Sequence, residues 1–147
     1  LKPCIAYIEH GKKKECMDLY TNMVYDLQEF NAIKFSLCIC DFWGTITYEI
    51  MAELLTLVTG REWTVEEMSE VGRRVINIAR AYNQREGFNR THDTVPKRVV
   101  KEALQNGPAA GQVIPPEAFE DMLDQYYEVM GWNNDGTMPE ELIQSLL

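Results

Sequence analysis

The sequence contains few of the residues that build the most recognisable metal and disulfide sites. It has two histidines and four cysteines in 147 residues, and the cysteines stand at positions 4, 16, 38 and 40. No pair of cysteines has the C-x-x-C spacing of a zinc ribbon, and four are too few for a dense disulfide scaffold. We therefore expect reduced thiols in a cytoplasmic protein.

Basic charge and long apolar runs are also scarce. Lys and Arg total 14 against 23 Asp and Glu, which gives a net charge of -9. Because nucleic-acid affinity depends on cationic side chains that displace counterions, this balance argues against a nucleic-acid partner. The apolar runs are far shorter than the roughly 20 residues that span a bilayer, so no membrane segment is expected. The basic residues of one quarter of the chain are expected to form internal salt bridges with acidic neighbours: Arg73, Arg74, Arg80, Arg85, Arg90, Lys97 and Arg98.

The apolar pattern predicts an all-α fold. Apolar residues recur at steps of three and four along most of the chain, and no segment shows the sustained alternation of a strand. We expect a single domain over residues 1–147, an irregular bundle of about five to seven helices with long loops. Since the chain starts at Leu1 and not at Met, it is expected to be a piece of a larger multidomain protein.

Helices are expected over residues 13–30, 47–59, 65–87, 97–104, 117–130 and 139–146. In the first helix, one apolar stripe is expected to face the core: Cys16, Leu19, Tyr20, Met23, Val24 and Leu27. In the third, the expected inner stripe is Val65, Met68, Gly72, Val75, Ala79 and Tyr82, widened by Val71 and Ile78. Segment 35–42 is apolar and short, and we expect it to be a buried connection and not a helix.

Several residues mark helix ends and one close contact. Gly60 and Gly131 follow apolar helical patterns and are expected to end them. Thr64 and Glu67 have the spacing of a capping box at the start of a helix. Gly72 costs about 1 kcal/mol of helix propensity relative to Ala, so a close helix crossing is expected there.

Segment 79–98 reads A-R-A-Y-N-Q-R-E-G-F-N-R-T-H-D-T-V-P-K-R, which is too particular for a generic helix end and loop. It resembles the C-terminal part of the tungsten-containing aldehyde ferredoxin oxidoreductases, where N-x-R-E-G-F is followed by D-x-x-P-x-R. The resemblance runs from about residue 12 to the C-terminus through three further stretches: A-E-L-L-T-L-V-T-G at 52–60, G-P-A-A-G at 107–111 and D-Q-Y-Y-E-V-M-G-W at 124–132. Their order and spacing together make the resemblance specific.

The resemblance implies one cluster ligand in this chain. The family's pterin and cluster motif, D-x-x-G-L-C, falls on residues 35–40, so Cys40 would be the last thiolate ligand of a 4Fe-4S cluster and Ile39 a contact to the pterin. Two positions depart from the motif. Phe35 stands where an aspartate would hydrogen-bond the pterin, and Cys38 stands where a glycine lets the backbone approach it.

For the complete protein, the resemblance implies oxidation of aldehydes to carboxylic acids at a tungsten (or molybdenum) bis-pterin centre, with electrons passing through the cluster to ferredoxin. The other cluster ligands of the family form a C-x-x-C-x-x-x-C motif, which this sequence lacks. Upstream domains of the same polypeptide would supply them, together with the pterin site and the aldehyde pocket. The chain alone is expected to hold no cofactor and to expose a face that supports a homodimer.

Other interpretations remain open at this point. Cys4 and Cys16 can in principle complete a local site with Cys38 and Cys40. The altered motif also fits a divergent metallopterin reductase of another substrate class, such as the aromatic-ring reductases. A third alternative is a helical interaction module that kept the fold and lost the cofactors.

No residue of this chain is expected to be catalytic. His10 lies in a polar N-terminal edge and His92 in a charged loop, and both are expected at the surface. Asp93 is expected to pin its loop through Arg90 and Arg98 instead of acting in acid-base chemistry.

Overall fold

The computed structural model describes residues 13–108 and 110–146, with side chains from residue 18 onward. In order, its elements are α2 (Lys13–Ser36), α3 (Tyr48–Thr59), α4 (Val65–Arg85), the 3-10 turn η1 (Arg90–His92), α5 (Lys97–Lys101), α6 (Pro116–Met130) and α7 (Glu140–Gln144). The described residues form no strand, so the expected all-α fold of helices joined by long loops is confirmed. None of the helices in this part of the chain is long and apolar enough to cross a membrane.

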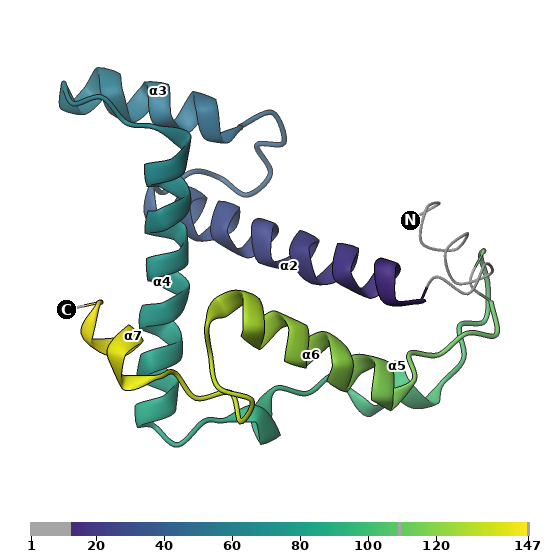
Figure 1. Ribbon diagram of the computed structural model, residues 1–147. Helices are drawn as coiled ribbons and strands as arrows, with labels where there is room; N and C mark the ends of the chain where they lie inside the picture. The colour runs from purple at the N-terminus through teal and green to yellow at the C-terminus, as the bar shows by residue number, and fades with distance from the viewer. Residues whose placement is uncertain (1–12, 109, 147) are drawn as a thin grey trace.

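Helix α4 is the axis of the arrangement (Figure 1). α2 crosses α4, and α3 lies at the N-terminal end of α4. α6 runs beside α2, while α7 packs near the C-terminal end of α4.

The predicted helix ends are confirmed where the sequence carries a cap. Thr47 accepts a hydrogen bond from the Ile50 amide at the start of α3, and Thr64 and Glu67 form the expected capping box of α4. Gly60 and Gly131 end α3 and α6 in the left-handed conformation, with φ of 70° and 72°. A glycine reaches this region without the steric cost that a Cβ imposes.

The crossing of α2 and α4 depends on Gly72. A Cβ at this position would lie 2.6 Å from the backbone oxygen of Glu29 on α2, so only glycine lets the two backbones approach this closely. The Glu29 side chain is buried at the same crossing, where it accepts hydrogen bonds from Ser69 Oγ and, at 3.0 Å, from Arg73 Nε. The close crossing expected at Gly72 is therefore confirmed.

The main apolar core lies where α2, α3 and the start of α4 meet. Its buried members are Ile33, Ile46, Met51, Ala52 and Met68. Partly buried side chains pack around them: Phe30, Leu37, Ile39, Tyr48, Leu55 and Trp63.

The predicted buried stripes were wrong for α2 and for most of α4. On α2, Leu19, Met23, Val24 and Leu27 are exposed, whereas the buried positions are Thr21, Glu29, Ile33 and Lys34. On α4, Met68 and Gly72 are buried as expected, but Val71, Val75, Ala79, Ile78 and Tyr82 are exposed. Helical spacing identifies an apolar face, but it does not determine which face a neighbouring helix covers. The side chain of Cys16 lies outside the described residues.

The predicted connection over 35–42 was also wrong in part. Helix α2 continues past residue 30 to Ser36, and both Phe35 and Phe42 are exposed. Helices α5 and α7 end earlier than expected, at Lys101 and Gln144.

Gly72→Ala should destabilise the fold. Overpacking costs about 1–3 kcal/mol, and this exceeds the gain in helix propensity of up to ~1 kcal/mol. We expect the urea midpoint to fall, with a net loss of about 1–2 kcal/mol. Gly44→Ala is the matched control, because a Cβ there meets nothing within 4 Å, and its midpoint should stay close to that of the wild type. Equal effects of the two substitutions would contradict the close crossing.

Candidate functional site

The segment that carries Cys40 begins with a helix-terminating turn. The Ile39 amide donates to the Lys34 carbonyl at 2.9 Å, and the Cys38 amide donates to the Phe35 carbonyl at 3.0 Å. This pair of bonds is the Schellman motif, which ends a helix through one residue in the left-handed region. That residue is Cys38, with φ of 56°, and no other non-glycine residue in the described part of the chain has positive φ.

The conformation of Cys38 is compatible with the glycine of the motif expected at residues 35–40. The resembling motif has glycine at this position, and the backbone of this chain adopts here the conformation that glycine occupies most easily. The side chain of Cys38 is therefore held at a conformational cost, while the turn itself is kept.

The side chains of residues 38 to 40 point in different directions. Cys38 and Cys40 are free, exposed thiols, whereas Ile39 between them packs against the apolar core. The turn continues with a hydrogen bond from the Trp43 amide to the Cys40 carbonyl at 3.1 Å. Core packing of Ile39 thus anchors the segment and leaves both thiols accessible.

Cys38 and Cys40 do not complete a metal site with other described residues. No group of three or more His, Cys, Asp or Glu side chains that could hold a metal occurs in the described part of the chain. Cys4 and the side chain of Cys16 lie outside the described residues, so the local site with four cysteines remains a prediction.

Segment 79–98 contributes Arg80 and Asp93 to a partly buried ion-pair joint between α4 and α6. Arg80 Nη1 and Nη2 donate to the two carboxylate oxygens of Asp93 at 2.9 and 2.6 Å, and Tyr127 Oη donates to the same carboxylate at 2.5 Å. Arg80 also donates to the Gly136 carbonyl at 2.8 Å, and its guanidinium carbon lies 4.7 Å from the centroid of the Trp132 ring. The joint thus ties α4 and the loop that carries Asp93 to α6 and to the turn at Gly136.

Asp93 pins its loop as expected, but the predicted partners were wrong. Its partners are Arg80 and Tyr127, whereas Arg90 pairs with Glu120 and Asp124 and Arg98 pairs with Glu102. Sequence spacing favoured the nearest arginines, but the loop folds back so that Asp93 faces α4. The quoted stretches at 79–98 and 124–132 already contained both true partners.

The electrostatics of the joint follow from burial and hydrogen bonding. Burial raises the pKa of Asp93, but the hydrogen bonds from Arg80 and Tyr127 outweigh it, so the pKa lies below its usual value. Burial, and then the hydrogen bond to Asp93, raise the pKa of Tyr127 well above its usual value. At neutral pH, Asp93 is therefore an ionised carboxylate and Tyr127 a neutral phenol.

Two further arginines of this quarter of the chain form ion pairs, but the prediction was wrong for Arg74, which donates to the backbone carbonyl of Leu146. Arg73 pairs with the buried Glu29 at 3.0 Å, and Arg85 pairs with its neighbour Glu86 at 3.1 Å. The expected internal salt bridges are present for these arginines. His92 is exposed, as expected, while His10 lies outside the described residues.

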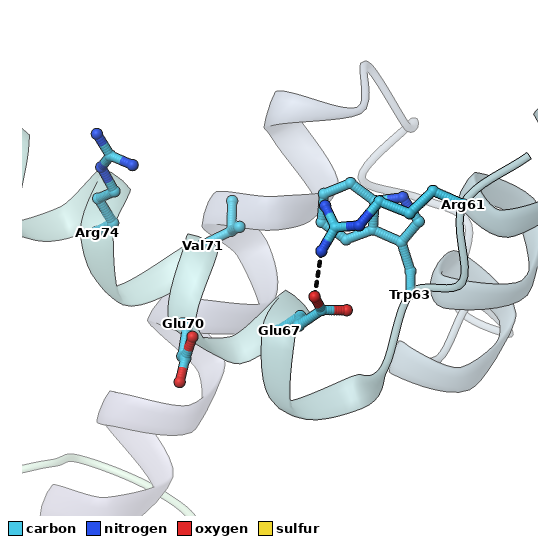
Figure 2. A pocket seen from close by; sticks show the side chains of 6 residues that line it. All are labelled: Arg61, Trp63, Glu67, Glu70, Val71 and Arg74. Atoms are coloured by element: carbon cyan, nitrogen blue, oxygen red, sulfur yellow. Dashed lines mark hydrogen bonds and ion pairs between the residues drawn. The ribbon is translucent and has the colours of Figure 1, made fainter. Parts of the chain in front are cut away.

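A shallow hollow of about 240 Å³ lies at the start of α4 (Figure 2). It is lined by Arg61, Trp63, Glu67, Glu70, Val71 and Arg74. Arg61 stacks 4.3 Å above the Trp63 ring and forms an ion pair with Glu67, while Arg74 donates to the Leu146 carbonyl at 2.9 Å. Both arginines are already engaged, and no predicted site residue lines the hollow, so it is not part of the candidate site.

Cys38→Gly should stabilise the chain. Glycine removes the left-handed penalty, which we expect to raise the free energy of unfolding by about 1 kcal/mol. Cys38→Ala keeps a Cβ and should give no such gain. Urea unfolding under reducing conditions measures both, and equal midpoints for the two variants would argue against a left-handed residue at this position.

Asp93→Asn should change how stability depends on pH. Because the folded pKa of Asp93 lies below the unfolded value, its contribution is fully present above pH ~4 and is lost as the pH falls through the folded value. At pH 7 the variant should be less stable by about 1–3 kcal/mol, since charged hydrogen bonds are lost. On acidification below pH ~4 the variant should lose less stability than the wild type.

The matched control for this experiment is Asp121→Asn, at an exposed position on α6. Thermal unfolding from pH 7 to pH 3 should give a wild-type profile for the control. If the unfolding temperature of Asp93→Asn changed with pH in the same way as that of the wild type, the carboxylate would not stabilise the joint.

Comparison with known proteins gives consistent matches. A family model described as aldehyde ferredoxin oxidoreductase, domains 2 & 3, matches residues 7–147. The tungsten-containing aldehyde ferredoxin oxidoreductase of Pyrococcus horikoshii is 30% identical over 132 residues, which cover 88% of this chain and 21% of that protein. The protein of the same description from Pyrococcus abyssi is 33% identical over 95 residues, or 64% of this chain and 15% of that protein.

A relative with a different description also matches. An aliphatic sulfonate oxidoreductase, WOR-like subunit, of Pyrococcus furiosus is 29% identical over 117 residues, which cover 76% of this chain and 19% of that protein. The chain thus spans between 15% and 21% of the length of these curated relatives. Since the family model matches almost the entire sequence, this chain belongs to the aldehyde ferredoxin oxidoreductase family.

Proposed function

We propose that this chain is a C-terminal helical domain of an aldehyde ferredoxin oxidoreductase-like enzyme, in which Cys40 supplies one thiolate to a 4Fe-4S cluster. The enzyme would oxidise aldehydes to carboxylic acids, with electrons leaving through the cluster to ferredoxin. The tungsten (or molybdenum) bis-pterin centre, when bound, would supply the oxygen-transfer and redox chemistry. Residues 1–147 would act as a single domain within a cytoplasmic protein.

The observation that carries this proposal is the placement of the Cys40 thiol. Cys40 is exposed, follows a fixed left-handed turn, and stands at the cysteine of the family motif. Thiolates are soft ligands that suit iron-sulfur clusters. No group of three or more His, Cys, Asp or Glu side chains that could hold a metal occurs among the described residues, so a cluster bound by Cys40 would take its other thiolates from outside them, in this proposal from the upstream part of the polypeptide.

Aromatic side chains near Cys40 support the same role. Phe35, Phe42 and Trp43 are exposed, and residue Phe42 is 97% exposed. Such an apolar surface would exclude water from a bound cluster, which is one way in which a protein sets a cluster's potential. The side chain of Ile39 packs on the core, so any contact with the pterin would use its backbone or the rim of its side chain.

A second candidate is a family member that acts on another substrate class. Phe35 lacks the carboxylate of the motif, and one relative is described as an aliphatic sulfonate oxidoreductase. A metallopterin enzyme of divergent specificity would keep the same role for Cys40. The substrate pocket of the complete protein would distinguish the two candidates.

Cys40→Ala should abolish or convert the cluster. The complete polypeptide that carries this chain is purified without oxygen, and its iron, acid-labile sulfide and electron paramagnetic resonance spectrum are measured. We expect a four-iron signal in the wild type and a lost or three-iron signal in Cys40→Ala, because one of four thiolates is missing.

Cys38→Ser is the matched control, two residues away and also exposed. It should keep the wild-type iron content and spectrum. A cluster that is indifferent to Cys40, or a wild-type protein without iron, would overturn the proposal and favour a helical binding module.

A further inference from the structure

A buried lysine lies beside the segment that carries Cys40. Lys34 is in the last turn of α2 and only 4% exposed. Its ammonium nitrogen donates to the backbone carbonyl of Asp41 at 3.0 Å and to the carboxylate of Asp41 at 2.9 Å. It also lies 5.7 Å from the centroid of the Phe30 ring.

These partners are more than a helix terminus requires. A lysine near a helix C-terminus can interact with the helix dipole while its ammonium stays in water. Burying an ammonium is costly unless hydrogen bonds and an opposite charge replace its hydration. The ammonium of Lys34 is therefore held in one place by Asp41 and Phe30.

Lys34 holds the chain on both sides of Cys40. Its backbone carbonyl accepts from the Ile39 amide at 2.9 Å, and its side chain holds the carbonyl of Asp41. Residues 39 and 41, the two neighbours of Cys40, are thus tied to the same residue of a rigid helix. The backbone of Cys40 has little freedom while both bonds are present.

We propose that Lys34 is a positioning residue that fixes the Cys40 thiolate for the cluster. This inference rests on the proposed function, because it assumes that Cys40 is a cluster ligand. Residues that orient a ligand without touching the metal typically change metal retention or activity by about 10–100-fold when they are removed. The side chain of Asp41 is 62% exposed, so its carboxylate can be removed without opening a cavity.

The test compares three variants with the wild type in the complete polypeptide, purified without oxygen. Lys34→Met keeps the length and burial of the side chain but removes the ammonium. Asp41→Ala removes the carboxylate and keeps the backbone carbonyl. Lys101→Met is the matched control, the same substitution at an exposed lysine on α5.

Two measurements separate positioning from general stability. The first is hydrogen exchange of residues 37–43 in the iron-free protein, which does not depend on the cluster. The second is the rate of iron loss to a ferrous chelator, together with the electron paramagnetic resonance line shape of the reduced cluster. Far-UV circular dichroism of the same samples confirms that the variants are folded.

Lys34→Met should accelerate exchange of residues 37–43 by about tenfold or more, since hydrogen bonds from a charged donor are lost. Iron loss should also be about tenfold faster, with an altered line shape. Asp41→Ala should give a smaller change in both, because the bond to the carbonyl remains. Lys101→Met should match the wild type.

Other outcomes overturn the inference. Unchanged exchange in Lys34→Met would show that the lysine does not hold the turn. Faster exchange with wild-type iron retention and line shape would show that it holds the turn without positioning a ligand. If Cys40→Ala, measured alongside, keeps the wild-type cluster, the proposed function itself fails and this inference fails with it.

Discussion

The close crossing of α2 and α4 at Gly72 is the constraint on which the rest of the fold depends. Because a Cβ on residue 72 would lie only 2.6 Å from the Glu29 backbone oxygen, the two helices can meet at this distance only with glycine in the middle of α4. On one side of the crossing, Ile33 and Met68 join the apolar core from which the Cys40 segment emerges. Further along α4, Arg80 begins the joint to α6. The crossing thereby fixes how the two ends of the domain are spaced.

Buried charged side chains, together with the apolar core, hold the helices of this domain in place. Glu29, Lys34 and Arg80 are all buried, and each has an oppositely charged partner and further hydrogen bonds. Such pairs contribute less net stability than well-packed apolar side chains, but they fix one geometry, since any other leaves a buried charge unpaired. Many large apolar side chains of α2 and α4, in contrast, are exposed.

Sequence reasoning succeeded where a residue acts locally and failed where the answer depends on a distant partner. The caps at Gly60, Thr64 and Gly131 were predictable, because each depends on bonds within a few residues. The exposed stripe of Leu19, Met23, Val24 and Leu27 was not, because burial depends on where α4 and α6 lie. The partners of Asp93 were missed for the same reason, since Tyr127 is distant in sequence.

The turn at Cys38 separates two roles that the family motif combines. One role is conformational: a residue in the left-handed region ends α2, and Cys40 follows it by two residues. The other is chemical: an acidic side chain accepts a hydrogen bond. Against the motif that we propose for residues 35–40, this chain has cysteine in place of glycine at position 38 and phenylalanine in place of aspartate at position 35. Because the turn is fixed by the Schellman bonds and by Lys34, it does not require the aspartate. A change in cofactor or substrate contacts can therefore occur here without displacing Cys40.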